Sequence, residues 1–141
     1  MLPPVPVLDG FADFARPFDG FVVDLWGVVH DGIRPYPGVV DCLSRLRAER
    51  RTVALLSNAP RRVGSVVAKL RALGVPDSCW DLVLSSGEAA HIALRDRDDA
   101  FHAALGPRFV HLGPERDIDV YQGLPYELVT DPAGADFLLN T

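Results

Sequence analysis

The stretch FVVDLWGVVHDG, residues 21–32, contains the features from which the fold and a candidate site can be inferred. Residues 21–23 form a β-branched and aromatic run that is typical of a buried strand, and the valines at 28–29 continue the apolar pattern. Asp24 stands at the carboxyl end of this predicted strand. A single acid at a strand end is more often a helix cap or a turn residue, so its interpretation depends on the segments that follow.

The segments after this strand alternate between helical and strand-like patterns. Apolar side chains recur at helical spacing in residues 39–50 and 62–73, whereas residues 53–56 and 80–84 are short, mainly apolar runs. Residues 85–88 have the S-x-x-E spacing of a capping box and predict another helix start. This alternation indicates βαβ units, and hence an α/β fold with a parallel sheet that helices cover on both faces.

Polar residues follow each of the three predicted strands. Asp24 follows the first, Ser57 and Asn58 follow the second, and residues 85–87 follow the third. Ligands of open parallel sheets bind outside the carboxyl ends of the strands. The sequence therefore predicts a binding site at this edge of the sheet.

The C-terminal part of the chain has a different pattern. After a charged and weakly helical stretch at 96–107, the segments RFVHLG, YELVT and DFLLNT read as short strands. We divide the chain into an N-terminal, proline-rich arm (1–18), a core (19–106) and a segment (107–141) that is the beginning of a cap domain or further core strands. The last apolar run reaches the final residues, so we expect a truncated sheet whose exposed edge could support a homo-oligomer.

The composition disfavours two classes of partner. The chain has 141 residues and a formal net charge of −5, with 14 Lys and Arg against 19 Asp and Glu, so it offers no basic field to nucleic acid or anionic lipid. No apolar run approaches the ~18 residues of a membrane span, and no signal-peptide pattern is present. Cys42 and Cys79 form no CxxC pair. We expect a cytoplasmic protein with reduced thiols.

Several of these segments together resemble a known family. Asp24 in DLWGVVHDG, Ser57 in ALLSNAP, and the helix and strand between them are similar to the haloacid dehalogenase superfamily. The likeness is greatest to its p-nitrophenylphosphatase-like branch (subclass IIA), in which a large cap follows the third strand. It covers roughly residues 20–95. It implies a Rossmann-like, three-layer parallel core, present as its N-terminal part with the start of an α/β cap. It also implies a Mg²⁺-dependent phosphatase that acts on a small phosphorylated metabolite through an aspartyl-phosphate intermediate.

The resemblance assigns roles to residues at two strand ends. Asp24 would be the nucleophile and, together with the backbone carbonyl of Trp26, a ligand of Mg²⁺, because this ion prefers hard oxygen ligands. Ser57 would donate its hydroxyl to a phosphoryl oxygen. The backbone amides of Asn58 and Ala59 would complete the phosphate site at the following helix start.

The sequence departs from the family pattern at two places. Trp26 stands where phosphatases of the family usually carry an acid for the leaving group, which implies slow turnover, a good leaving group or a replacement acid. Candidates for that acid are His30 and Asp31, in the loop that begins at Gly27. The family's phosphate-neutralising lysine and further metal-binding acids come after the cap. Because the only lysine here, Lys69, lies mid-helix without an evident role, Mg²⁺ binding should be weak.

Other interpretations fit the same residues. Arg61, directly after the SNAP segment, could steer an anionic substrate, although a solvated helix start is the simpler explanation. A non-catalytic relative would use the pocket only to bind a phosphorylated ligand. A flavodoxin-like signalling domain would be phosphorylated on Asp24, but the chain lacks the acidic pair expected ahead of it. Turnover distinguishes an enzyme from a binding protein.

Overall fold

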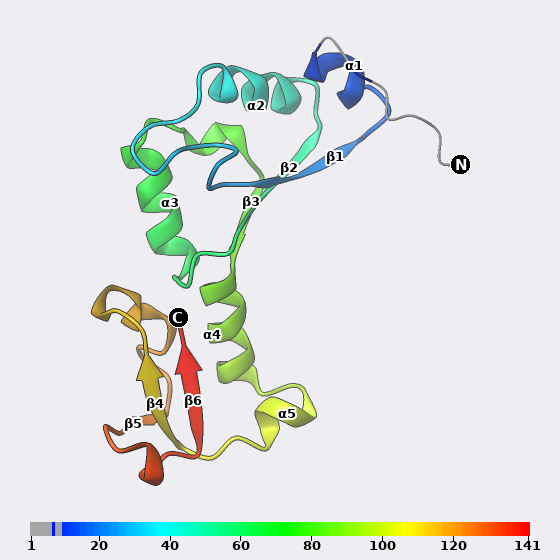
Figure 1. The fold of residues 1–141 in the computed structure, drawn as a ribbon. Helices are drawn as coiled ribbons and strands as arrows, with labels where there is room; N and C mark the ends of the chain where they lie inside the picture. Colours follow the sequence, from blue (N-terminus) through cyan, green and yellow to red (C-terminus); the bar gives the residue numbers. More distant parts are fainter. Residues whose placement is uncertain (1–6, 8–9) are drawn as a thin grey trace.

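The fold consists of two parallel sheets that follow one another along the chain. It is seen in a computed structural model that describes residue 7 and residues 10–141. Helix α4 (Ser86–Asp96) runs from the first sheet toward the second (Figure 1). Three prolines of the predicted arm, at positions 3, 4 and 6, lie outside the described residues. Helix α1 (Phe11–Ala15) packs beside the first strand, where the rings of Phe11 and Phe21 have centroids 5.7 Å apart.

The first sheet confirms the predicted α/β architecture. Its strands are β1 (Gly20–Asp24), β2 (Thr52–Ser57) and β3 (Leu82–Ser85), which are all parallel and lie in the order β1-β2-β3. The connections contain α2 (Val39–Ala48) and α3 (Val63–Ala72), followed by a short 3₁₀ turn, η1 (Asp77–Cys79). In this order, the carboxyl ends of all three strands meet at one edge of the sheet.

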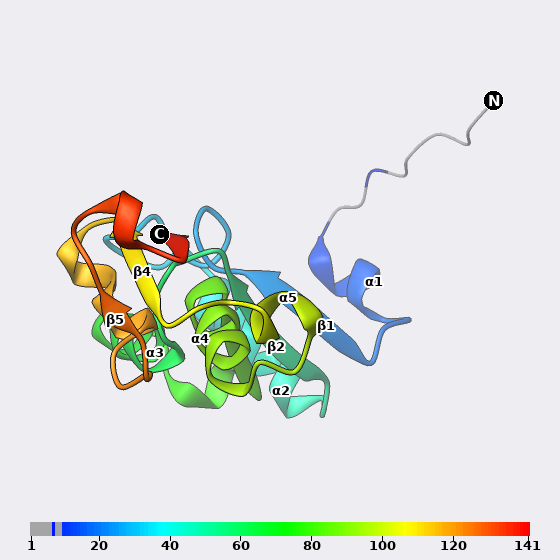
Figure 2. The same ribbon diagram turned by 90° about the horizontal axis from the view of Figure 1, so that it is seen from below.

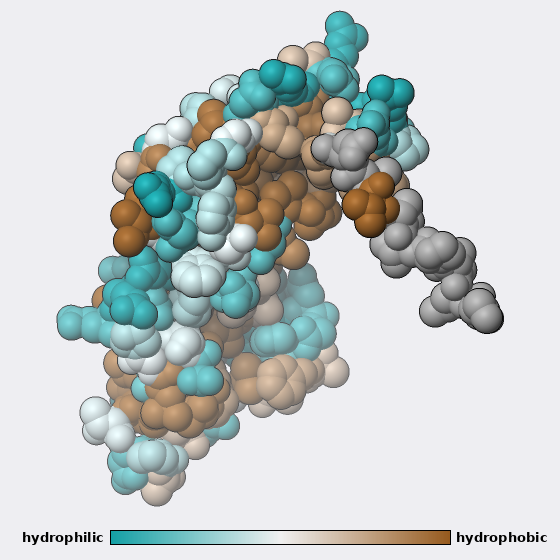
Figure 3. Space-filling model, turned by 45° about the horizontal axis from the view of Figure 1, so that its top comes forward, coloured by the Kyte–Doolittle hydropathy of each residue, from teal (hydrophilic) through white to brown (hydrophobic). Residues whose placement is uncertain are grey.

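Helices cover one face of this sheet. Val53 and Leu55 of β2 are fully buried, together with Leu43 of α2 and Leu70 of α3. The opposite face carries exposed side chains, and no helix covers it in the part of the chain that the structure describes. These side chains lie in register across the three strands: Val22, Ala54, Leu56, Leu82 and Leu84. Figure 3 shows apolar side chains at the molecular surface. The expected second helical layer is therefore not supplied by the described residues.

The valines at 28–29 do not continue the first strand, so that detail of the prediction is wrong. The chain turns directly after β1, where the amide of Val29 donates to the carbonyl of Leu25 at 2.8 Å. Gly27 has φ +81°, a conformation that favours glycine and ends the extended run. Val29 is nevertheless fully buried, because the turn folds it back onto the core. The loop thereby places Trp26 and His30 near the sheet edge.

The second sheet is smaller and has a core of its own. Its strands are β4 (Arg108–Leu112), β5 (Glu127–Leu128) and β6 (Phe137–Asn140), all parallel, in the order β5-β4-β6. Helix α5 (Ala100–Ala103) precedes them, and the 3₁₀ turns η2 (Glu115–Val120) and η3 (Pro132–Gly134) connect them. Phe109 packs against the rings of Tyr121 and Phe137 at 5.0 and 5.5 Å. Figure 2 shows this sheet on the other side of α4 from β1 and α1.

Two expectations about the chain's environment can be compared with the fold. Cys42 is half-buried and Cys79 is buried, and neither forms a disulfide within the described residues. Among the described helices, none is long and apolar enough to cross a membrane.

Candidate functional site

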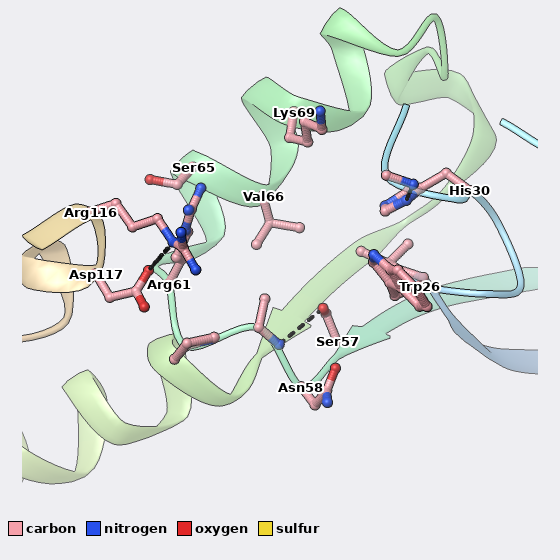
Figure 4. Close-up of a pocket in the computed structure, with 14 residues that line it drawn as sticks. Trp26, His30, Ser57, Asn58, Arg61, Ser65, Val66, Lys69, Arg116 and Asp117 are labelled. Atoms are coloured by element: carbon pink, nitrogen blue, oxygen red, sulfur yellow. Dashed lines mark hydrogen bonds and ion pairs between the residues drawn. The ribbon is translucent and has the colours of Figure 1, made fainter. Parts of the chain in front are cut away.

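A cavity of about 430 Å³ lies at the carboxyl edge of the first sheet (Figure 4). The loop after β2 forms one wall, α3 forms the opposite wall, and the loop after β1 and turn η2 contribute the remaining sides. Among the residues that line it are Trp26, His30, Ser57, Asn58, Ala59, Arg61, Ser65, Lys69, Arg116 and Asp117. The cavity therefore gathers residues that lie far apart in the sequence.

The phosphate-site candidates lie together in the loop after β2. The Ser57 side chain is buried at the strand end, and its Oγ accepts a hydrogen bond from the amide of Ala59 at 3.1 Å. We predicted that this amide would bind an anion, but in the structure it donates to Ser57 Oγ. Because Oγ acts as the acceptor, the hydroxyl proton of Ser57 remains free to be donated to a ligand.

The start of α4 holds this loop in place. Ser86 Oγ donates to the carbonyls of Asn58 and Ala59 at 2.8 and 3.0 Å, and the amide of Gly87 donates to the same Ala59 carbonyl at 3.1 Å. Since a peptide unit is planar and trans, the Asn58 carbonyl directed at α4 leaves the amide of Ala59 directed away from it. Residues 85–87, which we interpreted mainly as a helix start, are thus also the support of the loop.

Two arginines after the loop connect it to α4 and to turn η2. Arg61 Nε lies 3.0 Å from Oδ1 of Asp117, whose side chain is only 3% exposed. Arg62 binds both carboxylate oxygens of Glu88 at 2.7 and 3.0 Å. The Arg62 guanidinium lowers the pKa of Glu88, and Glu88 raises the pKa of Arg62. This ionic network fixes the second sheet's η2 turn against the mouth of the cavity.

Trp26 and His30 form the side of the cavity next to β1. The Trp26 indole is 66% exposed, whereas His30 is buried. His30 Nδ1 accepts the amide of Gly32 at 3.0 Å, which places the proton of the neutral imidazole on Nε2. Burial and then the charge of Lys69 lower the pKa of His30. His30 is therefore a neutral hydrogen-bond donor at pH 7, and a poor substitute for a protonated acid.

Asp24 lies at the end of β1, beside the strand that ends at Ser57. Its side chain lines a hollow that is distinct from the cavity described above. In register, Asp24 pairs with Leu56, and both side chains belong to the uncovered face of the sheet. The hollow beside Asp24 shares Trp26 and Asn58 with the cavity, so these two residues separate the two spaces. One carboxylate oxygen, Oδ1, accepts the amide of Leu25 at 2.8 Å.

Two other candidates do not line either space. Asp31 Oδ1 accepts the amides of Arg34 and Ile33 at 2.8 Å, and these bonds lower the pKa of Asp31. Gly27 donates its amide to the carbonyl of His30 at 2.9 Å. Both residues shape the loop after β1, and the Asp31 carboxylate is directed at amides of its own loop.

The residues around Asp24 offer few oxygen ligands for Mg²⁺. Among residue 7 and residues 10–141, no group of three or more His, Cys, Asp or Glu side chains could hold a metal ion. The oxygens present are the Asp24 carboxylate and the backbone carbonyl of Trp26, which are of the hard type that Mg²⁺ prefers. This donor set fits a weakly held, largely hydrated ion.

Sequence reasoning missed four residues that line the cavity with a polar or charged side chain. Lys69, interpreted above as having no role, lines it, and so do Ser65 of α3 and Arg116 and Asp117 of η2. The two α3 residues could have been found, because they lie four apart and so share one helix face. The η2 residues carry no such signal, since their position depends on how the second sheet docks.

The comparisons with known proteins agree with this fold. A family model described as haloacid dehalogenase-like hydrolase matches residues 21–125. A solved hydrolase of the haloacid dehalogenase-like family from Brucella suis 1330 is 30% identical, with a TM-score of 0.81 over 96% of this chain and 46% of that chain. A 4-nitrophenylphosphatase from Thermotoga maritima is 24% identical, with a TM-score of 0.61 over 87% of this chain and 44% of that one.

A hypothetical protein from Pyrococcus horikoshii OT3 is also 24% identical, with a TM-score of 0.55 over 79% of this chain and 40% of that one. At 24% identity, the Thermotoga and Pyrococcus structures show likeness of fold alone. No curated protein matches the chain. The chain spans less than half the length of each of these solved structures. The match over residues 21–125 shows that this chain belongs to the haloacid dehalogenase-like hydrolases, the superfamily that its sequence resembled.

Proposed function

We propose that this chain is the nucleophile-bearing part of a Mg²⁺-dependent phosphatase for a small phosphorylated metabolite. The observation that carries the proposal is the placement of Asp24 beside the Ser57 loop, at the ends of two neighbouring strands of a hydrolase fold. The loop lies in a cavity of about 430 Å³, within the usual size of small-molecule sites.

The proposed reaction uses the Asp24 carboxylate as nucleophile. One carboxylate oxygen attacks phosphorus while the bond from phosphorus to the leaving oxygen breaks, and the leaving group departs with the electron pair. Water then attacks phosphorus while the bond from phosphorus to the Asp24 oxygen breaks. The Asp24 carboxylate is restored, and the released phosphate carries away both protons of the water. The Ser57 hydroxyl donates to a phosphoryl oxygen throughout. Bound Mg²⁺, held by Asp24 and the Trp26 carbonyl, would neutralise part of the phosphoryl charge.

Trp26 and His30 limit the choice of leaving group. An indole cannot protonate a departing alkoxide, and His30 is neutral at pH 7 because its pKa is lowered. General acid catalysis contributes about 10²- to 10⁴-fold. With Mg²⁺ present, we expect this chain to hydrolyse acetyl phosphate and p-nitrophenyl phosphate at least ~10²-fold faster than ethyl phosphate, as measured by kcat/KM.

A variant at position 26 makes this test sharper. Trp26→Asp supplies an acid at the expected position, so it should raise the rate on ethyl phosphate far more than the rate on acetyl phosphate. Equal rates on the three phosphates in the unmodified chain would show that an acid is already present. In that case the leaving-group part of the proposal is wrong.

A binding protein is the second candidate function. The hollow that contains Asp24 is distinct from the cavity that contains Ser57, and only Trp26 and Asn58 line both. A phosphorylated ligand could therefore occupy the cavity without contacting the nucleophile. Saturable binding of phosphate without any turnover of acetyl phosphate would favour this alternative.

We further propose that residues 107–141 belong to a cap over the cavity. In support, helix α4 leaves the first sheet after its third strand, and turn η2 brings Arg116 and Asp117 to the cavity. A cap placed in this way would influence which substrates enter.

We expected self-association through an exposed sheet edge, and the uncovered face of the first sheet offers a second surface for it. The exposed face includes Val22, which is 73% exposed, and β1 pairs only with β2 in the described structure. We expect the mean mass in sedimentation to rise with protein concentration, and Val22→Glu to suppress this rise. Ile33→Glu is the matched control, because Ile33 is an exposed apolar residue in a loop. A monomer at every concentration would contradict the proposal.

A further inference from the structure

The cavity lining carries a net positive formal charge, although the chain as a whole carries a net charge of −5. Three cationic side chains line it, Arg61, Lys69 and Arg116, against the single carboxylate of Asp117. That carboxylate is already engaged, because it lies 3.0 Å from Arg61 and 3.8 Å from Arg116. The lining therefore has more positive charge than its own acid can balance.

Lys69 is the cation without an acidic partner. Within residue 7 and residues 10–141, no carboxylate lies within 4.0 Å of its ammonium, whereas Arg61 and Arg116 both have one. The next cation along α3, Arg71, is bound to Asp77 at 2.6 Å and does not line the cavity. Lys69 is exposed, and its ammonium is free to form a charge-assisted hydrogen bond with an anion in the cavity.

Lys69 lies apart from the loop after β2, which is the proposed phosphate site. Figure 4 shows Lys69 on the α3 wall, with Ser57 and Asn58 on the opposite wall and His30 to one side. The charge of Lys69 contributes to the lowered pKa of His30, which is consistent with an ammonium directed toward that side of the cavity. A ligand bound at Ser57 would therefore need a second group to reach Lys69.

We propose that Lys69 binds a second anionic group of the substrate, so that the preferred substrates are small phosphorylated molecules that also carry a carboxylate or a second phosphoryl group. This inference rests on the proposed function, because it takes the Ser57 loop as the site of the reacting phosphoryl group. The cavity volume of about 430 Å³ has room for a short molecule with charges at both ends.

Non-hydrolysable phosphonates test the proposal without requiring turnover. The three probes are propylphosphonate, 3-phosphonopropanoate and ethane-1,2-bisphosphonate, in which the same two methylenes join the phosphonate to a methyl, carboxylate or phosphonate second end. Titration calorimetry on the 141-residue chain should give a Kd about five- to tenfold lower for at least one of the two doubly anionic probes than for propylphosphonate. The probe with the larger gain identifies the second group.

The variants then assign this preference to one side chain. Lys69→Met keeps the length of the side chain without its charge and should remove the preference, and Lys69→Arg should keep most of it. Arg71→Met removes the same charge from the same helix outside the cavity, so it should leave the preference unchanged.

The outcomes separate this inference from the proposed function. If all three probes bind equally, or if the preference survives in Lys69→Met, the assignment to Lys69 is wrong while the phosphoryl site stands. If no probe binds, or if Ser57→Ala leaves every Kd unchanged, the phosphoryl site itself is wrong and the proposal falls with it.

Discussion

Asp24→Asn should abolish the Mg²⁺-dependent hydrolysis of acetyl phosphate, with a loss of at least ~10³-fold. The carboxylate is the nucleophile in the proposed reaction, and a neutral amide of the same shape cannot form the acyl phosphate. The amide oxygen can still accept the hydrogen bond that Leu25 donates to Oδ1 at 2.8 Å. Phosphate release measured in parallel with thermal unfolding should therefore show lost activity in a chain that folds normally.

A matched control separates charge at the site from charge in general. Asp41→Asn removes one carboxylate from the surface of α2, where Asp41 pairs with Arg45 at 2.9 Å. This variant should retain the unmodified rate. Mass spectrometry of the unmodified chain, quenched in acid during turnover, should locate the phosphoryl group on Asp24. Activity that persists in Asp24→Asn would mean that a different group is the nucleophile, or that the measured activity comes from a contaminant.

The elements of the first sheet could be predicted because their signals are local. Apolar runs of four to six residues identified β2 and β3, and helical spacing identified α2 and α3. The capping pattern at residues 85–88 was also informative, since Ser85 Oγ accepts the amide of Glu88 at 3.2 Å. Each of these signals depends on side chains within a few positions of one another, so no knowledge of the tertiary fold was needed.

The errors arose where the tertiary arrangement decides the structure. The valines at 28–29 are buried by a turn that folds back on the core, so an apolar pair was mistaken for continued strand. The Glu88 side chain does not complete its capping box, because it binds Arg62 instead. Asp117 lies in a 3₁₀ turn of the second sheet, 56 positions from its partner Arg61, and no local pattern marks that pair.

Gly87→Ala should lower the free energy of unfolding, measured in urea, by about 3 kcal/mol. This is the largest effect that we expect from a substitution that adds atoms without removing an interaction. A Cβ at this position would lie 2.2 Å from the backbone nitrogen of Arg61 and 2.6 Å from its carbonyl carbon and oxygen. These are backbone atoms, so neither residue can relieve the contact by changing a rotamer. The loop after β2 and the start of α4 would have to separate.

Gly64→Ala provides the matched control with the opposite sign. Gly64 is also a helical glycine, in α3, but a Cβ there would meet no atom within 4 Å. Alanine is the better helix former by ~1 kcal/mol, so this variant should be slightly more stable than the unmodified chain. If both variants were stabilised, helix propensity alone would explain the data, and the close packing of α4 on the loop would be wrong.

Gly87→Ala also tests whether α4 positions the loop after β2, which is the proposed phosphate site. Ser86 Oγ and the Gly87 amide hold the Asn58 and Ala59 carbonyls, so a shift of α4 should move the loop that contains Ser57. At temperatures where Gly87→Ala remains folded, its affinity for inorganic phosphate should fall about tenfold, while that of Gly64→Ala should not change. A folded Gly87→Ala chain with unaltered phosphate affinity would show that the loop keeps its shape without this support. The hydrogen bonds from α4 to the loop would then contribute only to the stability of the fold.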